Sequence, residues 1–175
     1  MIMGSMKKLI SICGSDGDDE RLSKHALEVA EKLGRLVAQN EGVLVCGGRG
    51  GIMRAACKGA KEADGITVGI LPFSKEEANE FVDIRIPTGL GNMRNFLVAN
   101  SGDVVIAIGG RWGTLNEISF DMILGKPLIL VKGTGGCVDK IIEKEIMQHV
   151  ESTYYIAESA EEAVEKAFEL AAKLK

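Results

Sequence analysis

Short apolar runs alternate with amphipathic segments along most of the chain. The apolar runs lie near residues 7–13, 43–46, 66–71, 82–86, 103–108 and 127–131. Their hydrophobic residues are continuous rather than alternating, which is typical of strands that are buried on both faces of a parallel sheet. The pattern therefore predicts six strands of a mostly parallel sheet.

The segments between these runs carry apolar residues at helical spacing. We expect helices near residues 26–37, 52–64, 75–80, 92–101, 114–125, 138–150 and 160–171. Strands that alternate with helices predict a single-domain, Rossmann-like α/β fold, a three-layer sandwich with helices on both faces of the sheet. No repeat, low-complexity tract or linker divides residues 1–175, so we expect one domain.

The composition agrees with one compact domain and argues against nucleic acid and membrane partners. The chain has 175 residues, 46% of them hydrophobic, with 22 glycines and 3 prolines. Its net charge is −4 and its basic residues are scattered, so we expect no nucleic acid partner. No apolar run reaches the roughly 18 residues that span a bilayer, so we expect no membrane partner and a cytoplasmic protein. Residues 1–6 are too short for a signal peptide, and we expect them to be disordered or left over from cloning.

The cysteines and histidines argue against a metal site. The 4 cysteines form no Cys-x-x-Cys pair. Cys13 and Cys46 end predicted strands, where a buried free thiol is the ordinary interpretation. The 2 histidines, His25 and His149, lie on predicted helices. We therefore expect no metal, no disulfide framework and a reducing compartment.

Three of the predicted strands end in glycine-rich turns that lead into helices. The turns are Cys13-Gly14-Ser15, Gly47-Gly48-Arg49-Gly50-Gly51 and Gly109-Gly110-Arg111-Trp112-Gly113. The carboxyl ends of parallel strands meet at one sheet edge, where open α/β folds bind ligands. Unpaired N–H groups at a helix start attract anions, and glycines let a phosphate approach them closely. The turns therefore predict a site for a phosphorylated small molecule, with a nucleotide as the first candidate.

The candidate phosphate- or nucleotide-binding residues come from these turns and from the start of the helix that follows the last one. They are Gly14, Ser15, Gly47, Gly48, Arg49, Gly50, Gly110, Arg111, Trp112, Gly113 and Thr114. The turn at 47–51 does not fit the dinucleotide fingerprint, because Met53 stands where that motif has glycine or alanine. No Walker loop is present either, so NAD binding and ATP hydrolysis are disfavoured. A tight turn that only packs a helix against a strand is the structural alternative for 47–51.

Two charged residues beside the turns have both a structural and a chemical interpretation. Thr114-Leu115-Asn116-Glu117 has the pattern of a capping box, in which Thr114 caps a helix and Glu117 bonds back to the cap. Ser159-Ala160-Glu161-Glu162 has the same pattern without chemistry nearby, so Glu117 could be only a cap. Arg94 lies in the first turn of a predicted helix and opposes its dipole. It should therefore have an anionic partner, either a protein carboxylate or a ligand.

In order along the chain, these motifs resemble the Lonely Guy (LOG) family, often labelled lysine decarboxylase-like. The resemblance runs from about Leu9 to Val131 and covers most of the chain. It rests on Cys13-Gly14-Ser15, Gly50-Gly51-Ile52-Met53-Arg54-Ala55, Val68-Gly69-Ile70-Leu71-Pro72, Arg94-Asn95 and the segment from Gly109 to Glu117. It implies hydrolysis of the N-glycosidic bond of a nucleoside 5′-monophosphate. Arg94 and Glu117 would be the catalytic pair, and the turn at 110–114 would hold the phosphate.

The sequence differs from the LOG pattern at three positions, and there it resembles a sister branch that includes molybdenum-cofactor carrier proteins. Asn95 stands where the family has lysine, Gly109 replaces its proline and Arg111 replaces its second glycine. The resemblance then implies a binder or carrier of a phosphorylated nucleotide- or pterin-like molecule, with a nucleotide or the molybdenum cofactor as the bound group and no cofactor required. The alternative is a nucleoside 5′-monophosphate phosphoribohydrolase. Arg94 and Glu117 favour the enzyme, and the lost lysine favours the carrier.

Two further expectations concern assembly and the decarboxylase label. The resemblance implies a homodimer or homotetramer, and the apolar run Ile118–Leu124 agrees with a covered surface. The decarboxylase label finds no support, because no lysine lies in a recognisable pyridoxal-phosphate motif. The motifs are compatible with both an enzyme and a binding protein.

Overall fold

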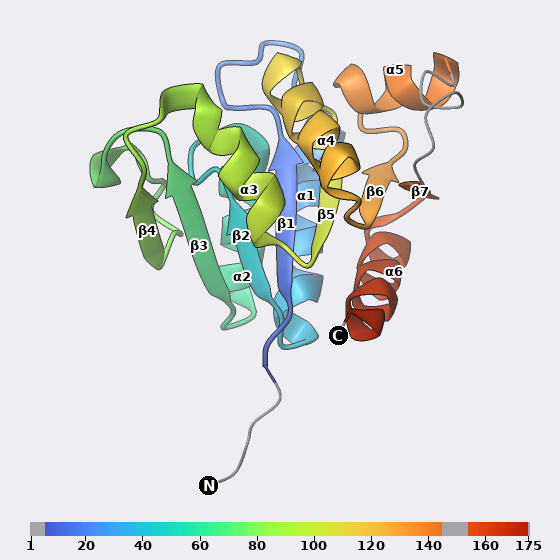
Figure 1. Ribbon diagram of the computed structural model, residues 1–175, viewed down its shortest axis with the longest axis horizontal. Coiled ribbons are helices and arrows are strands. Elements are labelled where there is room, and N and C mark those ends of the chain that lie inside the picture. The colour runs from blue at the N-terminus through green and yellow to red at the C-terminus, as the bar shows by residue number, and fades with distance from the viewer. Residues whose placement is uncertain (1–5, 145–153, 175) are drawn as a thin grey trace, which may run out of the picture.

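Seven parallel strands form one sheet at the centre of the computed structural model (Figure 1). The structure describes residues 6–144 and 154–174. The strand order is β4-β3-β2-β1-β5-β6-β7, and every neighbouring pair is parallel. The strands are β1 (Leu9–Gly14), β2 (Val43–Cys46), β3 (Ile66–Leu71), β4 (Ile84–Pro87), β5 (Val104–Ile108), β6 (Leu128–Val131) and β7 (Tyr154–Ala157). The order reverses between β1 and β5, which places the topological switch point at their carboxyl ends.

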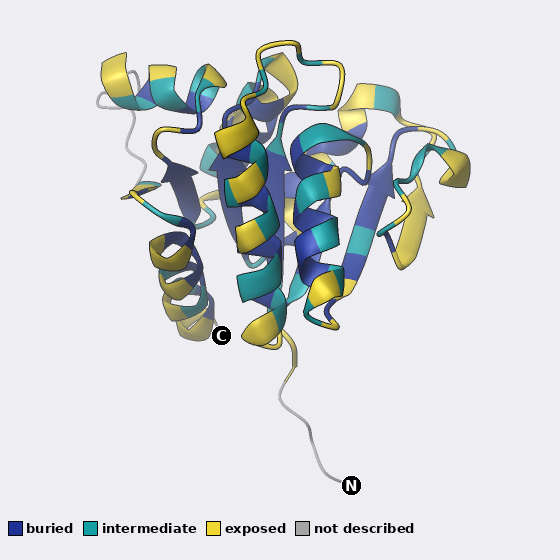
Figure 2. Cartoon of the chain, turned by 180° about the vertical axis from the view of Figure 1, so that it is seen from behind, coloured by how far each residue is buried: buried dark blue, intermediate teal, exposed yellow. Residues whose placement is uncertain are grey.

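Helices cover both faces of this sheet, which confirms the predicted three-layer α/β sandwich. One face packs against α1 (Lys24–Gln39), α2 (Gly51–Glu62) and α6 (Ala160–Lys173), which are seen from behind in Figure 2. The other face packs against α3 (Asn95–Ser101), α4 (Trp112–Leu124) and α5 (Gly136–Lys144). Each face thus has its own apolar cluster.

The central strands are buried as the sequence predicts, whereas the edge strand β4 is not. All five residues of β5 and all four of β6 are buried, as continuous hydrophobicity predicts. All four residues of the edge strand β4 are exposed. β4 also begins at Ile84, two residues later than predicted.

The sequence missed one strand and misjudged several helix ends. β7 was not predicted, although Tyr154-Tyr155-Ile156 is rich in strand-forming residues. The helix expected at 75–80 is a single 3₁₀ turn, Lys75–Glu77. The helix expected at 92–101 is divided into a 3₁₀ turn, Gly91–Arg94, and the helix α3. Short polar segments offer too little apolar periodicity to distinguish a turn from a helix.

Two expectations fall partly outside the described residues. α5 begins at Gly136 and is described to Lys144, so the predicted extension to residue 150 lies outside the described range. The expectation for residues 1–6 likewise falls almost wholly outside it. At the other end of the chain, α6 begins as the sequence predicts, with the Ser159 hydroxyl accepting a hydrogen bond from the Glu162 N–H at 3.2 Å.

Candidate functional site

The three glycine turns meet at a single pocket at the carboxyl edge of the sheet, as the sequence predicts. This pocket, here called the arginine pocket, has a volume of about 430 Å³. Arg49 enters from the turn between β2 and α2, Arg94 from the end of the 3₁₀ turn before α3, and Arg111 from the turn between β5 and α4. Segments far apart in the sequence therefore bring three guanidinium groups to one place.

Most of the sequence-predicted site residues line this pocket. The predicted residues that line it are Gly14, Ser15, Arg49, Arg94, Arg111, Trp112, Gly113, Thr114 and Glu117. Gly47, Gly48, Gly50 and Gly110 do not line it. Residues that the prediction left out of the site also line it, among them Asp16, Asp18 and Asn116.

Gly47 supports the pocket by leaving space for an arginine. A Cβ atom at this position would lie 2.6 Å from Nη2 of Arg94 and 2.8 Å from Sδ of Met53. Any side chain at position 47 would therefore displace the Arg94 guanidinium. The turn at 47–51 is thus more than a place where a helix packs against a strand.

The capping-box prediction for Thr114 and Glu117 is wrong. α4 begins at Trp112, with Arg111 at the N-cap position and no side-chain hydrogen bond to the cap. Gly110 has φ +90°, a conformation that favours glycine, and this lets the chain enter the helix before Thr114. Glu117 consequently lies in the second turn, 6% exposed, rather than at the helix start. It is free to act in the pocket.

Arg94 and Glu117 form a buried pair. Nη1 of Arg94 lies 3.7 Å from Oε1 of Glu117, and both side chains are 8% exposed. The same Nη1 also donates to Oδ1 of Asn95, the residue that replaces the family lysine. The predicted anionic partner of Arg94 is therefore a protein carboxylate. Nε of Arg94 is buried and has no hydrogen-bond partner among the described residues, so part of its donor capacity is unused.

Burial makes the Glu117 carboxyl group a weaker acid than an exposed glutamate. Desolvation raises the pKa of Glu117 to about 7, while Arg94 and a hydrogen bond with Cys13 oppose this rise. Near neutral pH the side chain therefore exchanges between its protonated and ionised forms. A carboxyl group with its pKa close to the working pH is a common property of functional sites.

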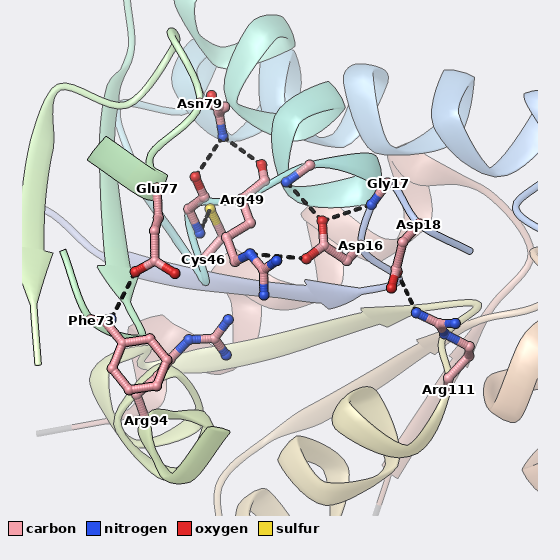
Figure 3. A network of polar contacts seen from close by, with 12 residues as sticks. Asp16, Gly17, Asp18, Cys46, Arg49, Phe73, Glu77, Asn79, Arg94 and Arg111 are labelled. Carbon is pink, nitrogen blue, oxygen red and sulfur yellow. Dashed lines mark hydrogen bonds and ion pairs between the residues drawn. The ribbon is translucent and has the colours of Figure 1, made fainter. Parts of the chain in front are cut away.

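An acidic loop holds the other two arginines. Figure 3 shows Asp16 paired with Arg49 and Asp18 paired with Arg111. Nε of Arg49 lies 3.1 Å from Oδ2 of Asp16, and Nε of Arg111 lies 3.6 Å from Oδ2 of Asp19. Sequence reasoning missed these partners, although the run Asp16-Gly17-Asp18-Asp19-Glu20 directly follows the first glycine turn. A bound anion would therefore compete with internal aspartates for these guanidinium groups.

Metal clusters, disulfides and membrane-spanning helices are absent from the residues that the structure describes. Within it, no cluster of three or more histidine, cysteine, aspartate or glutamate side chains is placed to hold a metal ion. All four cysteines are free thiols. None of the helices between residues 6 and 174 that the structure describes is long and apolar enough to cross a membrane.

The model of the SLOG cluster4 family matches residues 7–164, a span that contains every residue of the arginine pocket. The chain belongs to this family. The match confirms the resemblance to LOG-like proteins on which the sequence-based expectations rest.

Solved structures and one relative are similar to this SLOG protein over most of its length. The molybdenum cofactor binding protein of the phototrophic bacterium Rippkaea orientalis has a TM-score of 0.85 and 36% identity, covering 95% of this chain and 99% of that one. The molybdenum cofactor carrier protein of Chlamydomonas reinhardtii has a TM-score of 0.81 and 33% identity, covering 96% and 100%. An uncharacterized protein of Archaeoglobus fulgidus is 39% identical over 123 residues, which are 70% of this chain and 79% of that protein.

Proposed function

We propose that this SLOG protein binds a phosphorylated small molecule with a nucleotide- or pterin-like ring, as a carrier similar to the molybdenum cofactor proteins above. One observation carries the proposal: three arginines from three separate loops meet in one pocket, and a buried donor of Arg94 has no partner among the described residues. Guanidinium groups suit phosphate because their planar donors match its oxygens.

The start of α4 supports the same ligand. Arg111 at the N-cap offers no side-chain acceptor to the N–H groups of the first turn, which contains Trp112, Gly113 and Thr114. Unpaired N–H groups at the positive end of a helix attract phosphate. Nearby, Arg94 supplies the buried positive charge, so a phosphate would meet both backbone and side-chain donors.

The balance of charge explains how an anion could enter. Three carboxyl groups, of Asp16, Asp18 and Glu117, line the pocket beside the three arginines. The raised pKa of Glu117 leaves this group partly protonated near neutral pH, which makes the pocket more positive. Asp18 is 75% exposed, so it can move into water when a ligand takes its place. We infer that the aspartates are displaceable counter-ions.

The molybdenum cofactor would be cargo in this proposal rather than a reagent of the protein. It is a pterin that carries a phosphate, and the arginine pocket provides for that phosphate. No residue of this chain is assigned to its metal. The supporting observations are the pocket and the likeness to two proteins named for this cofactor.

Melting temperatures test the proposal. Nucleoside 5′-monophosphates should raise the melting temperature of the protein where the corresponding nucleosides do not. A ligand that binds only the folded state stabilises it by about 2.7 kcal/mol at a concentration one hundred times its dissociation constant. Equal shifts with and without the phosphate would overturn the phosphate site.

A nucleoside 5′-monophosphate phosphoribohydrolase is the second candidate function, and the Arg94–Glu117 pair favours it. A carboxylate beside the sugar can stabilise the positive charge of an oxocarbenium-like transition state. The arginine can organise the leaving group or the phosphate. Asn95 in place of the family lysine counts against this activity.

We also propose that a second copy of the chain covers an apolar groove beside the arginine pocket. The groove has a volume of about 500 Å³, and its apolar walls include Leu90, Met93, Phe96 and Phe120. Met93 is 75% exposed in the single chain, a large apolar surface to leave in water. The groove shares Asn92 and Asn116 with the arginine pocket, so a partner there would also border the ligand.

Light scattering tests this assembly. The expected mass at micromolar protein concentration is that of a dimer or tetramer. Replacing Met93 by glutamate puts a charge in the groove and should shift the mass toward that of a monomer. The control Met6→Glu changes another exposed methionine that does not line the groove. A monomeric mass for the unmodified protein would refute the proposal.

A further inference from the structure

A second pocket lies directly beside the arginine pocket. It has a volume of about 530 Å³ and shares Ser15, Arg111 and Trp112 with its neighbour. Leu22, Leu115, Cys137 and other residues complete its walls, so we call it the Trp112 pocket. The two pockets are parts of one hollow, with Arg111 and Trp112 between them.

Several of the hydrogen-bonding groups that line the Trp112 pocket are already paired within the protein. The Thr134 hydroxyl donates to the carbonyl of Val131 at 2.6 Å and accepts from the Gly109 N–H at 2.9 Å. The N–H of Cys137 donates to the carbonyl of Gly110 at 2.8 Å. These groups are therefore already engaged within the protein.

Charged residues at the edge of this pocket are also occupied. The Lys140 ammonium pairs with Glu143 at 2.6 Å, and Arg21 lies 3.7 Å from Asp19. The side chains of Lys140 and Arg21 are themselves largely exposed to solvent. Neither cation lines the arginine pocket, where the phosphate is proposed to bind.

Trp112 gives the pocket a flat aromatic wall. Trp112 is 84% exposed, although tryptophan is normally largely buried in folded proteins. Leu22 and Leu115 add apolar surface close by. A planar ring stacks favourably on an exposed aromatic side chain, and this attraction tolerates different ring types.

We propose that the Trp112 pocket holds the planar heteroaromatic ring of the ligand whose phosphate lies in the arginine pocket. This inference rests on the proposed function and adds a division of labour within the site. The polar pocket takes the anionic end, and the carbon-lined pocket takes the ring. A ligand with both parts would span the hollow across Arg111 and Trp112.

Intrinsic fluorescence gives a direct readout, because Trp112 is the only tryptophan of the chain. The probes are ribose 5-phosphate and the tightest binder among AMP, CMP, GMP and IMP. Both should bind in calorimetry, since both carry the phosphate. Only the nucleotide should quench the emission of Trp112, because only it has a ring to stack on the indole.

Three variants separate ring binding from phosphate binding. Trp112→Ala should weaken nucleotide affinity at least about fivefold, the usual loss when an aromatic stacking partner is removed. Trp112→Phe keeps an aromatic ring and should restore most of the affinity. Leu174→Ala, the control, changes an exposed apolar residue that lines neither pocket. Ribose 5-phosphate should bind the control variant as it binds the unmodified protein, and Trp112→Ala should weaken its binding less than it weakens that of the nucleotide.

The outcomes distinguish this inference from the proposed function. If Trp112→Ala binds the nucleotide as well as the unmodified protein does, the ring lies elsewhere and only the inference fails. Emission that depends on protein concentration but not on ligand would show that a second copy covers the indole, which also overturns it. If neither probe binds the unmodified protein, the proposed function fails and the inference fails with it.

Discussion

Glu117→Gln should lower the hydrolysis of the preferred nucleoside 5′-monophosphate at least about 100-fold if this SLOG protein is a phosphoribohydrolase. Losing one group that stabilises developing charge typically costs this much. Glutamine keeps the shape of the side chain but removes the carboxylate that lies 3.7 Å from Arg94. Chromatographic release of the free base measures the rate. Glu20→Gln, the same change on an exposed residue that does not line the pocket, is the matched control.

Two further measurements test the same catalytic role of Glu117. Hydrolysis by the unmodified protein should rise with pH through about 7, because the ionised form of Glu117 would stabilise the transition state. Arg94→Ala should also slow the reaction, without multiplying the effect of Glu117→Gln, since residues that act together are not additive. Undiminished activity of Glu117→Gln would disprove its catalytic role. Binding without any hydrolysis by the unmodified protein would leave the carrier function as the answer.

Asp121→Asn should change how the stability of the protein depends on pH. Asp121 on α4 is 0% exposed, and neither carboxylate oxygen has a hydrogen-bond partner among the described residues. Burial raises the pKa of Asp121 to about 8, although Lys126 opposes the rise. The unfolded chain ionises this group near pH 4, so between about pH 4 and 8 the folded state binds more protons than the unfolded state. The free energy of unfolding therefore falls as pH rises through this window.

Urea denaturation at pH 6, 7 and 8 measures the effect. A group that is protonated only in the folded state contributes a slope of about 1.4 kcal/mol per pH unit. Asp121→Asn should flatten the slope of the unmodified protein, leaving the smaller contribution of Glu117, whose pKa is also raised. Asp64→Asn, a change at an exposed aspartate, should leave the slope as it is. Equal slopes for the Asp121→Asn variant and the unmodified protein would contradict this account of the buried carboxyl.

The central sheet could be predicted from sequence because its burial is uniform. β5 and β6 lie under helices on both faces, so their composition alone identifies them. The strand β7 is harder to detect, since three of its four residues are exposed or only partly buried. Its hydrophobic pattern is correspondingly short.

The glycine turns predicted where the arginine pocket forms, and the pairing of charges within it depends on the fold. Thr114 and Glu117 match a capping box in sequence, but positive φ at Gly110 moves the helix start to Trp112. The partners of Arg111 lie more than ninety residues away in the chain, at Asp18 and Asp19. No local pattern indicates such contacts, because they arise where two loops meet at the sheet edge.

Phosphorus NMR tests the central claim most directly, because it observes the phosphate itself. The ³¹P resonance of the tightest-binding nucleoside monophosphate should shift or broaden when the protein is added, with saturation at one site per chain. Asp18→Asn removes a carboxylate that competes for Arg111 and should tighten binding about two- to fivefold, the range expected for an exposed ion pair. Glu20→Gln removes the same charge from a neighbouring position and should leave the affinity unchanged. A ³¹P resonance that the protein does not perturb, for any of AMP, CMP, GMP and IMP, would contradict the account.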